Sequence, residues 1–228
     1  MSTTWLIRYW SVVILLLIRL LGAAAIMWSV ALLPTFWHQE RIDQMARHII
    51  AGERFQASDR ASVSATLDTL AAANYGSAAI SRSVAIARLG LAERSLDDGA
   101  TDEFRNHTSL LREAAGRWAS DAPADPLFWL VSFSLSNFQD GFEFEHLKYL
   151  AMSYALGPRE GWLAIRRNRL AIALFSVLPP DLARETISEF TGMVDSGLYS
   201  IAADTLLGPG WTVRDKLLSA LKESRRAN

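Results

Sequence analysis

The chain has 228 residues, of which 50% are apolar and 21% are charged, and its formal net charge is −1. This near-neutral balance excludes a nucleic-acid-binding protein, because phosphate binding needs a clustered excess of Lys and Arg. The sequence has no cysteine, which excludes disulfides and thiolate metal sites.

The first predicted element is an apolar run of 24 residues from Trp10 to Leu33, interrupted only by Arg19. As a helix it would cover about 36 Å, enough to cross a hydrocarbon core of roughly 30 Å. We therefore expect one transmembrane helix in an anchor segment, residues 1–37, that contacts the lipid bilayer through residues 10–33. A cleaved signal peptide with its small-residue site at residues 23–25 is the alternative.

The charges around this run predict its orientation. Arg8 and the amino terminus precede the run, which favours a cytoplasmic amino terminus and a periplasmic carboxy-terminal domain. Only three of the 23 basic residues are lysines, a bias that suggests a GC-rich bacterial genome. The expected location is the bacterial inner membrane, with a single pass. Arg19 either extends its side chain to the headgroups or makes an intramembrane contact with a partner helix.

Residues 38–57 are expected to form a juxtamembrane amphipathic helix. One face of this stretch is apolar at helical spacing, with Ile42, Ala46 and Ile49 among its members. The helix either lies on the membrane surface or begins the core of the following domain. Because it carries no marked basic excess, we favour the core.

The remaining residues, 58–228, are predicted to be an all-α domain. Apolar residues recur at helical spacing between short breaks rich in Gly, Pro and Asp, and no strand pattern is found. The main predicted helices cover residues 59–73, 78–96, 128–138, 142–156, 160–178, 181–195 and 198–207. Another helical stripe precedes the break at residues 121–126, and a last helix begins with a capping signature at Thr212.

A period of about 33 residues is present in this domain. Pro126 and Trp129 are echoed by Pro158 and Trp162, with spacings of 32 between the prolines and 33 between the tryptophans. A helix that ends at Ala155-Leu156-Gly157 lies between them. Here the chain resembles the tetratricopeptide repeat family, whose helical hairpins carry an early Trp, small residues in the second helix and a closing Pro. The resemblance implies a stack of antiparallel helical hairpins, an α-solenoid, with these positions in its core.

The search for chemistry gives few candidates. The histidines at positions 38, 48, 107 and 146 form no recognised metal-ligand spacing. No nucleophile elbow, phosphate loop or dinucleotide fingerprint is present. The nearest polar cluster is Glu143-Phe144-Glu145-His146, interpreted as an exposed turn with its phenylalanine partly buried. We therefore predict no catalytic, cofactor-binding or metal-binding residue.

Two features indicate a binding surface. Arg159, Arg166, Arg167 and Arg169 concentrate positive charge around one helix start, which predicts a patch for an anionic partner. Alternatively, these guanidiniums pair with nearby acids such as Glu160, Asp181 and Glu185. The second feature is a dense series of aromatic residues, most of them expected in the core. The series comprises Trp118, Phe128, Trp129, Phe133, Phe138, Phe142, Phe144, Tyr149 and Trp162.

Two functions fit this sequence. The first is a membrane-anchored helical-repeat scaffold that binds membrane-associated protein partners, as an accessory component of a bacterial envelope or exopolysaccharide assembly system. The alternative is an envelope enzyme acting on cell-wall glycans, with a non-local active site. An enzyme would need a deep cleft with two convergent carboxylates, whereas a scaffold would present an open groove.

Overall fold

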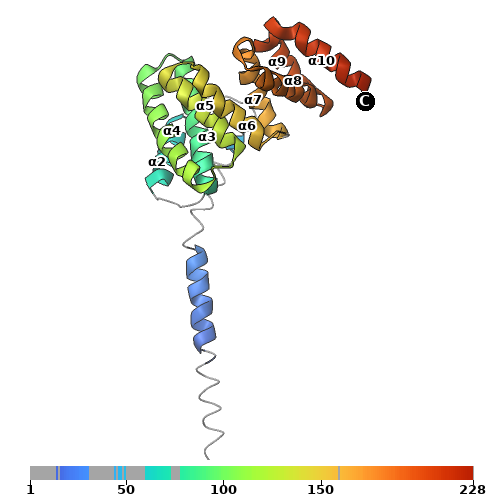
Figure 1. Ribbon diagram of the computed structural model, residues 1–228. Helices are drawn as coiled ribbons and strands as arrows, with labels where there is room; N and C mark the ends of the chain where they lie inside the picture. Colours follow the sequence, from blue (N-terminus) through green and yellow to red (C-terminus); the bar gives the residue numbers. More distant parts are fainter. Residues whose placement is uncertain are drawn as a thin grey trace, which may run out of the picture. The chain divides into compact units, whose positions relative to one another are not determined.

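The computed structural model describes residues 14, 16–30, 44, 46, 47, 49, 60–72, 78–158 and 160–227. Within these residues the regular elements are α-helices and short 3-10 helices, and no strand is present (Figure 1). The predicted all-α class is therefore confirmed. The chain divides into two units, Met1–Arg41 and Ile42–Asn228. This division falls at a later position than residue 37, where we expected the anchor segment to end.

The first unit corrects the predicted transmembrane helix. No helix in the described part of the chain is both long enough and apolar enough to cross a membrane. The helical residues described in this unit are residue 14 and residues 16–30. The predictions of a membrane-spanning helix and of a single-pass inner-membrane location are therefore wrong. The prediction depended on the apolar composition of residues 10–33, of which the structure describes residue 14 and residues 16–30.

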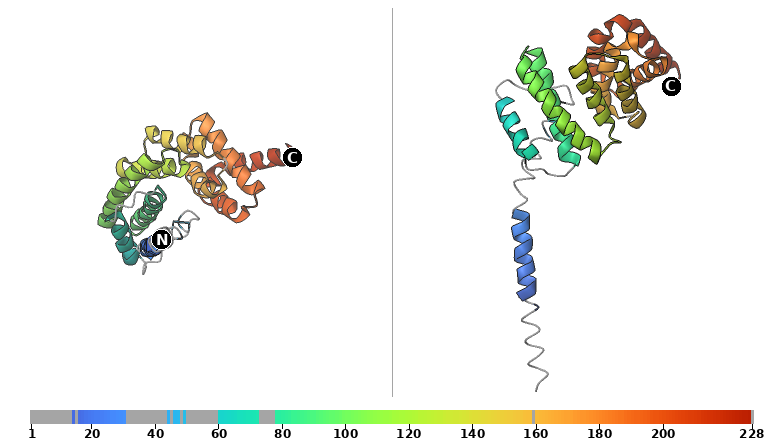
Figure 2. Two further views of the ribbon diagram at one scale, coloured as in Figure 1. Left: turned by 90° about the horizontal axis from the view of Figure 1, so that it is seen from below. Right: turned by 60° about the vertical axis from the view of Figure 1, so that its left-hand side comes forward.

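The second unit contains the labelled helices. Its elements, in chain order, are α2 (Arg60–Ala72), α3 (Ala78–Asp97), α4 (Thr101–Asp121), α5 (Pro126–Asp140), η2 (Phe144–His146), α6 (Leu147–Leu156), α7 (Gly161–Ala173), η3 (Phe175–Val177), α8 (Pro180–Asp195), α9 (Tyr199–Leu207), η4 (Pro209–Val213) and α10 (Arg214–Ala227). Consecutive helices pack in pairs: α3 with α4, α5 with α6, and α7 with α8. Figure 2 shows α3 and α4 side by side along most of their length. Helices that follow one another in the chain are thus paired in the described part of this unit, whereas a stacked α-solenoid stays a prediction.

Local sequence explains where these helices begin and end. Before α5, the Asp125 carboxylate accepts a hydrogen bond of 2.9 Å from the backbone N–H of Leu127, and Pro126 occupies the first helical position. After α8, Gly197 adopts a φ of 83°, which a side chain would disfavour. The N–H groups of Gly197 and Leu198 then bond to the Val194 and Met193 carbonyls, at 3.0 Å each. This is a Schellman cap, and it confirms the predicted glycine stop.

Two clusters of buried apolar side chains form the core. The larger cluster runs from α2 to α8 and includes the fully buried Leu67, Trp118 and Leu150. Ala46 and Ile49 also belong to it, so the amphipathic stretch contributes to the domain core rather than lying apart from it. The smaller cluster joins α7, α8, α9 and α10 through Ile172, Phe190, Ala202 and Leu217. Because α7 and α8 contribute to both clusters, they are the link between the two ends of the unit.

Candidate functional site

A groove lies between α6 and α8, which we call the α6–α8 groove. Its volume is about 720 Å³, within the range of pockets that take up a ligand. Helix α6 packs on α5, and α8 packs on α7. The lining residues are Phe144, Glu145, Leu147, Lys148, Ala151, Tyr154, Ala155, Pro158, Pro179, Asp181, Leu182 and Glu185.

Small side chains on α6 keep this groove open. Leu147, Ala151 and Ala155 are spaced four residues apart, so they form one stripe along the helix. Leu147 is buried, whereas Ala151 and Ala155 are exposed on the groove wall. A methyl side chain at these two positions leaves room that a larger residue would occupy. The groove therefore depends on the size of two exposed side chains.

The floor of the groove is apolar and buried. Tyr154 and Leu182 are 4% and 6% exposed, respectively, and Leu182 belongs to the larger core cluster. The groove thus opens directly onto the packed interior of the unit. An apolar group that entered it would be removed from water on several sides, which is favourable.

A buried ionic network holds α6, α7 and α8 behind this floor. Arg167 of α7 is fully buried, and it forms an ion pair with Glu189 of α8, whose side chain is 6% exposed. The same guanidinium donates to the Ser153 carbonyl at 2.6 Å and to the Gly157 carbonyl at 2.9 Å, both at the end of α6. It also lies 4.0 Å from the ring centroid of Tyr154. One side chain thereby fixes three helices, which sets the position of both groove walls.

The Tyr154 hydroxyl completes the network. It donates a hydrogen bond of 2.8 Å to Glu189 Oε2. Burial, followed by the negative charge of Glu189, raises the pKa of Tyr154 well above its usual value. The phenol therefore stays protonated and uncharged at neutral pH, and it acts as a fixed donor rather than as an acid.

Charged residues stand on the rim of the groove. Glu145 and Lys148 lie on the side of η2 and α6, and Asp181 and Glu185 lie on α8. All four are exposed. Asp181 also accepts a hydrogen bond of 2.5 Å from Arg184, in a pair whose side chains are 87% and 76% exposed. The rim thus carries three carboxylates and one ammonium group.

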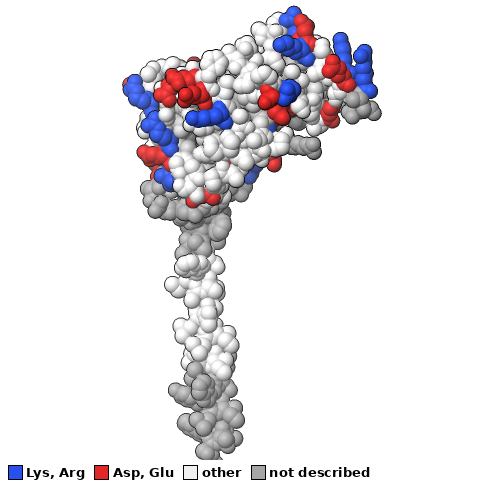
Figure 3. Space-filling view, viewed as in Figure 1, with Lys and Arg blue, Asp and Glu red and all other residues white. Residues whose placement is uncertain are grey.

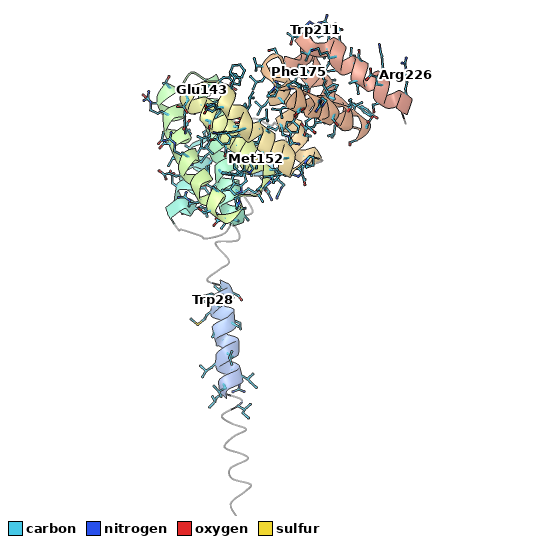
Figure 4. All side chains as sticks on the ribbon, in the orientation of Figure 1. Trp28, Glu143, Met152, Phe175, Trp211 and Arg226 are labelled. Atoms are coloured by element: carbon cyan, nitrogen blue, oxygen red, sulfur yellow. The ribbon has the colours of Figure 1, made fainter. Side chains whose placement is uncertain are left out.

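Apolar surface continues beyond the groove. Phe144 is 69% exposed and meets the ring of Phe142 edge to face, with centroids 5.7 Å apart. On α6, Met152 and Leu156 are 39% and 40% exposed, one residue along from the groove stripe. In Figure 3 the surface is uncharged where Figure 4, in the same orientation, labels Met152. Exposed apolar side chains beside a groove are typical of interaction sites.

The predicted arginine patch is not gathered on one surface. Arg167 is buried in the ionic network, and Arg166 pairs with Glu93 of α3 and donates to the Ile49 carbonyl at 3.0 Å. Arg169 is exposed, and Arg159 lies outside the described residues. Two of these guanidiniums therefore have acidic partners, but the partners come from distant helices rather than from the nearby acids.

The repeat-signature residues fall in different environments. Pro126 begins α5, and Trp129 is half-buried, stacked on Tyr149 and bonded through Nε1 to the Pro123 carbonyl at 2.9 Å. Trp162 is 37% exposed, with the Arg82 guanidinium 5.2 Å from its ring centroid. Ala155 and Pro158, expected in the core, are exposed and line the groove. Residues at the same position in the two copies of the period are thus buried to different extents.

The structure also shows whether the other residues singled out from the sequence are buried or exposed. Arg19 is exposed among the helical residues 16–30. In the polar cluster, both glutamates and Phe144 are exposed, whereas His146 is buried. Among the aromatic series, Trp118 and Phe133 lie in the core. No group of His, Asp and Glu in the described part of the chain is arranged to hold a metal ion.

No protein-family model, curated protein or solved structure matches this chain. The relation to tetratricopeptide repeats therefore stays a prediction.

Sequence reasoning missed the groove itself. The signal was present, because Ala151 and Ala155 form a small pair four residues apart within the apolar stripe of one helix. Of this pair, only Ala155 is predicted in the core, through the repeat resemblance, and Ala151 is not among the predicted site residues. Only the position of α8, which begins more than twenty residues later, shows that the pair faces open space.

Proposed function

We propose that the chain is an interaction module, built from stacked helical hairpins, that binds a segment of another protein in the α6–α8 groove. The observation that carries the proposal is a groove of about 720 Å³ with an apolar floor and exposed alanines on its wall. It opens beside further exposed apolar residues. The proposal keeps the scaffold function expected from the sequence and omits the membrane anchor.

Two features support a protein partner over a small ligand. The groove is an open trough rather than an enclosed cavity. In addition, the apolar surface extends past it to Phe142, Met152 and Leu156, farther than a ligand held in the groove alone would cover. A protein segment is long enough to use both areas at once.

The enzyme alternative has less support. Glycoside hydrolysis requires two carboxyl groups held on opposite sides of the scissile bond in a cleft. The acids of the groove stand on its rim, and the Asp181 side chain is 87% exposed to solvent. Rim carboxylates of this kind are suited to attracting a charged partner rather than to proton transfer.

The proposal is tested by site-specific photocrosslinking with the full-length chain in its native cells. A photoreactive amino acid replaces Ala155 in the groove, and the matched control replaces Ala203, an exposed alanine on α9. We expect a discrete protein adduct at position 155 that is absent at 203. The captured protein, purified, should bind the wild-type chain and lose at least about tenfold affinity for Ala151→Trp. Failure to form any protein adduct at 155 overturns the proposal.

A further inference from the structure

The charges and dimensions of the groove identify the kind of segment that it accepts. We propose, resting on the function above, that the occupant is an amphipathic α-helix of a partner protein whose polar face is basic. Its apolar face would lie on the groove floor, and its Lys and Arg side chains would meet the acidic rim.

The rim provides the charge argument. Three carboxylates, those of Glu145, Asp181 and Glu185, border the groove, against the single ammonium group of Lys148. That ammonium lies 5.1 Å from the ring centroid of Tyr149, which does not line the groove. Asp181 and Glu185 are four residues apart on α8, so they present negative charge along one wall. In Figure 3 acidic side chains also gather where Figure 4 labels Glu143, beside η2.

The pairing of Asp181 with Arg184 does not cancel this charge. Both side chains are largely exposed, and an exposed ion pair between residues three apart on a helix is weak. A Lys or Arg side chain of a docked partner would therefore compete with Arg184 for the Asp181 carboxylate. Glu185 is exposed and forms no ion pair with another residue that the structure describes.

The length of the groove favours a helix. From Leu147 to Ala155 the wall runs eight residues along α6, which is about 12 Å, or roughly two turns. The anchors of a docked helix at positions i, i+4 and i+7 span about 10.5 Å, so three of them fit within this length. Exposed Ala151 and Ala155 then provide the space into which those anchors insert.

Backbone hydrogen bonding also argues against an extended segment. An extended segment needs partners for its N–H and C=O groups, whereas a helix satisfies its own. The floor residues Leu147, Tyr154 and Leu182 offer one polar atom, the Tyr154 hydroxyl. That hydroxyl already donates to Glu189. An apolar floor of this kind therefore favours a helical segment, whose backbone N–H and C=O groups are already hydrogen-bonded to one another.

The test uses three synthetic peptides with the same Leu face, each cross-linked to hold the helix, and with Lys, Gln or Glu at the polar positions. Fluorescence anisotropy measures their affinity for the full-length chain. We expect the Lys peptide to bind at least about tenfold tighter than the Glu peptide, with the Gln peptide between them. Added salt should reduce this difference, because the rim is exposed.

Two variants of the rim make the test specific. Asp181→Lys with Glu185→Lys should reverse the order of the three peptides. Asp97→Lys with Glu113→Lys changes the net charge equally at exposed positions of α3 and α4, away from the groove, and should leave the order unchanged. Circular dichroism checks that each variant keeps its helical content.

The two proposals fail in different ways. If all three peptides bind equally, or the Glu peptide binds best, while Ala151→Trp still blocks binding, the basic partner is overturned and the groove function stands. If no peptide binds, or if Ala151→Trp has no more effect than the matched Ala203→Trp, the helix proposal is overturned in full. A protein adduct at position 155 then decides whether the groove function survives with another kind of segment.

Discussion

Gly157 lies directly against Pro126, where the end of α6 meets the start of α5. A Cβ atom on residue 157 would lie 2.7 Å from Pro126 Cγ and 2.8 Å from Pro126 Cβ, distances that packed atoms do not adopt. The Gly157 carbonyl also accepts the hydrogen bond from Arg167. The glycine therefore lets one hairpin close and, at the same point, joins it to the buried ionic network.

Gly157→Ala should destabilise the domain by about 1–3 kcal/mol, because the added methyl group overlaps the proline ring. Urea unfolding followed by circular dichroism measures the change. Gly116→Ala is the control, since residue 116 lies inside α4 with nothing within 4 Å of its Cβ position. That control should stabilise the helix by about 0.5–1 kcal/mol. Equal effects from the two substitutions would contradict the close contact.

Arg167→Met should cost about 3–5 kcal/mol of unfolding free energy, because it leaves the Glu189 carboxylate buried without its partner. The double variant Arg167→Met with Glu189→Leu should recover part of this loss, since it removes the second charge as well. Arg105→Ala breaks an exposed pair with Asp102 and is the control, expected to change stability by less than about 1 kcal/mol. A loss at Arg167 no larger than that at Arg105 would count against the network.

His107 should make stability fall in mild acid. Burial, and next the positive charge of Arg88, lowers the pKa of His107 below its usual value of 6.5, whereas Glu103 and Asp68 act against this. As the pH drops below about 6.5, the unfolded chain takes up a proton that the folded protein resists, so the unfolding free energy decreases. Melting temperatures between pH 7.5 and pH 5 measure this slope.

His107→Gln should make that pH dependence shallower, whatever its effect on stability at pH 7.5. The comparison of slopes is needed because other charged groups face the imidazole, including Arg60 of α2. Nδ1 of His107 is buried and has no hydrogen-bond partner among the described residues. Identical slopes for the wild type and the variant would show that His107 does not titrate differently in the folded state.

Asp125→Ala should destabilise the domain by about 0.5–2 kcal/mol through loss of the cap of α5. The carboxylate also pairs with Arg82 at 3.1 Å. Asp125→Asn is the matched variant, because its side-chain oxygen still accepts from the Leu127 N–H while the negative charge is removed. Thermal unfolding should therefore show a smaller loss for Asn than for Ala. Equal losses for the two variants would place the stabilisation in the ion pair with Arg82 rather than in the cap.

Local patterns were sufficient for the helices of the second unit. The predicted helix at residues 181–195 appears as α8, Pro180–Asp195, and that at 198–207 appears as α9, Tyr199–Leu207. Proline, glycine and Asp stops act over a few residues, so they can be recognised without tertiary contacts. The predicted helix at 160–178 is shorter, because α7 ends at Ala173 and a 3-10 turn follows.

Long-range contacts were the part that local patterns missed. Arg167 has the sequence context of a surface arginine, yet Glu189 pairs with it from 22 positions away. Nothing within one helix identifies such a partner. The same limit applies to Ala155, whose exposure depends on where α8 lies. The burial of Arg167 and the exposure of Ala155 both depend on helices that are distant in the sequence.

The two exposed alanines on the groove wall separate the shape of the groove from the folding of the domain. Neither methyl group contributes to the buried core, so larger or smaller residues at positions 151 and 155 would reshape the contact surface while the hairpins stay intact. The shape of the groove is thus open to stepwise change, one side chain at a time, by evolution or by an engineer.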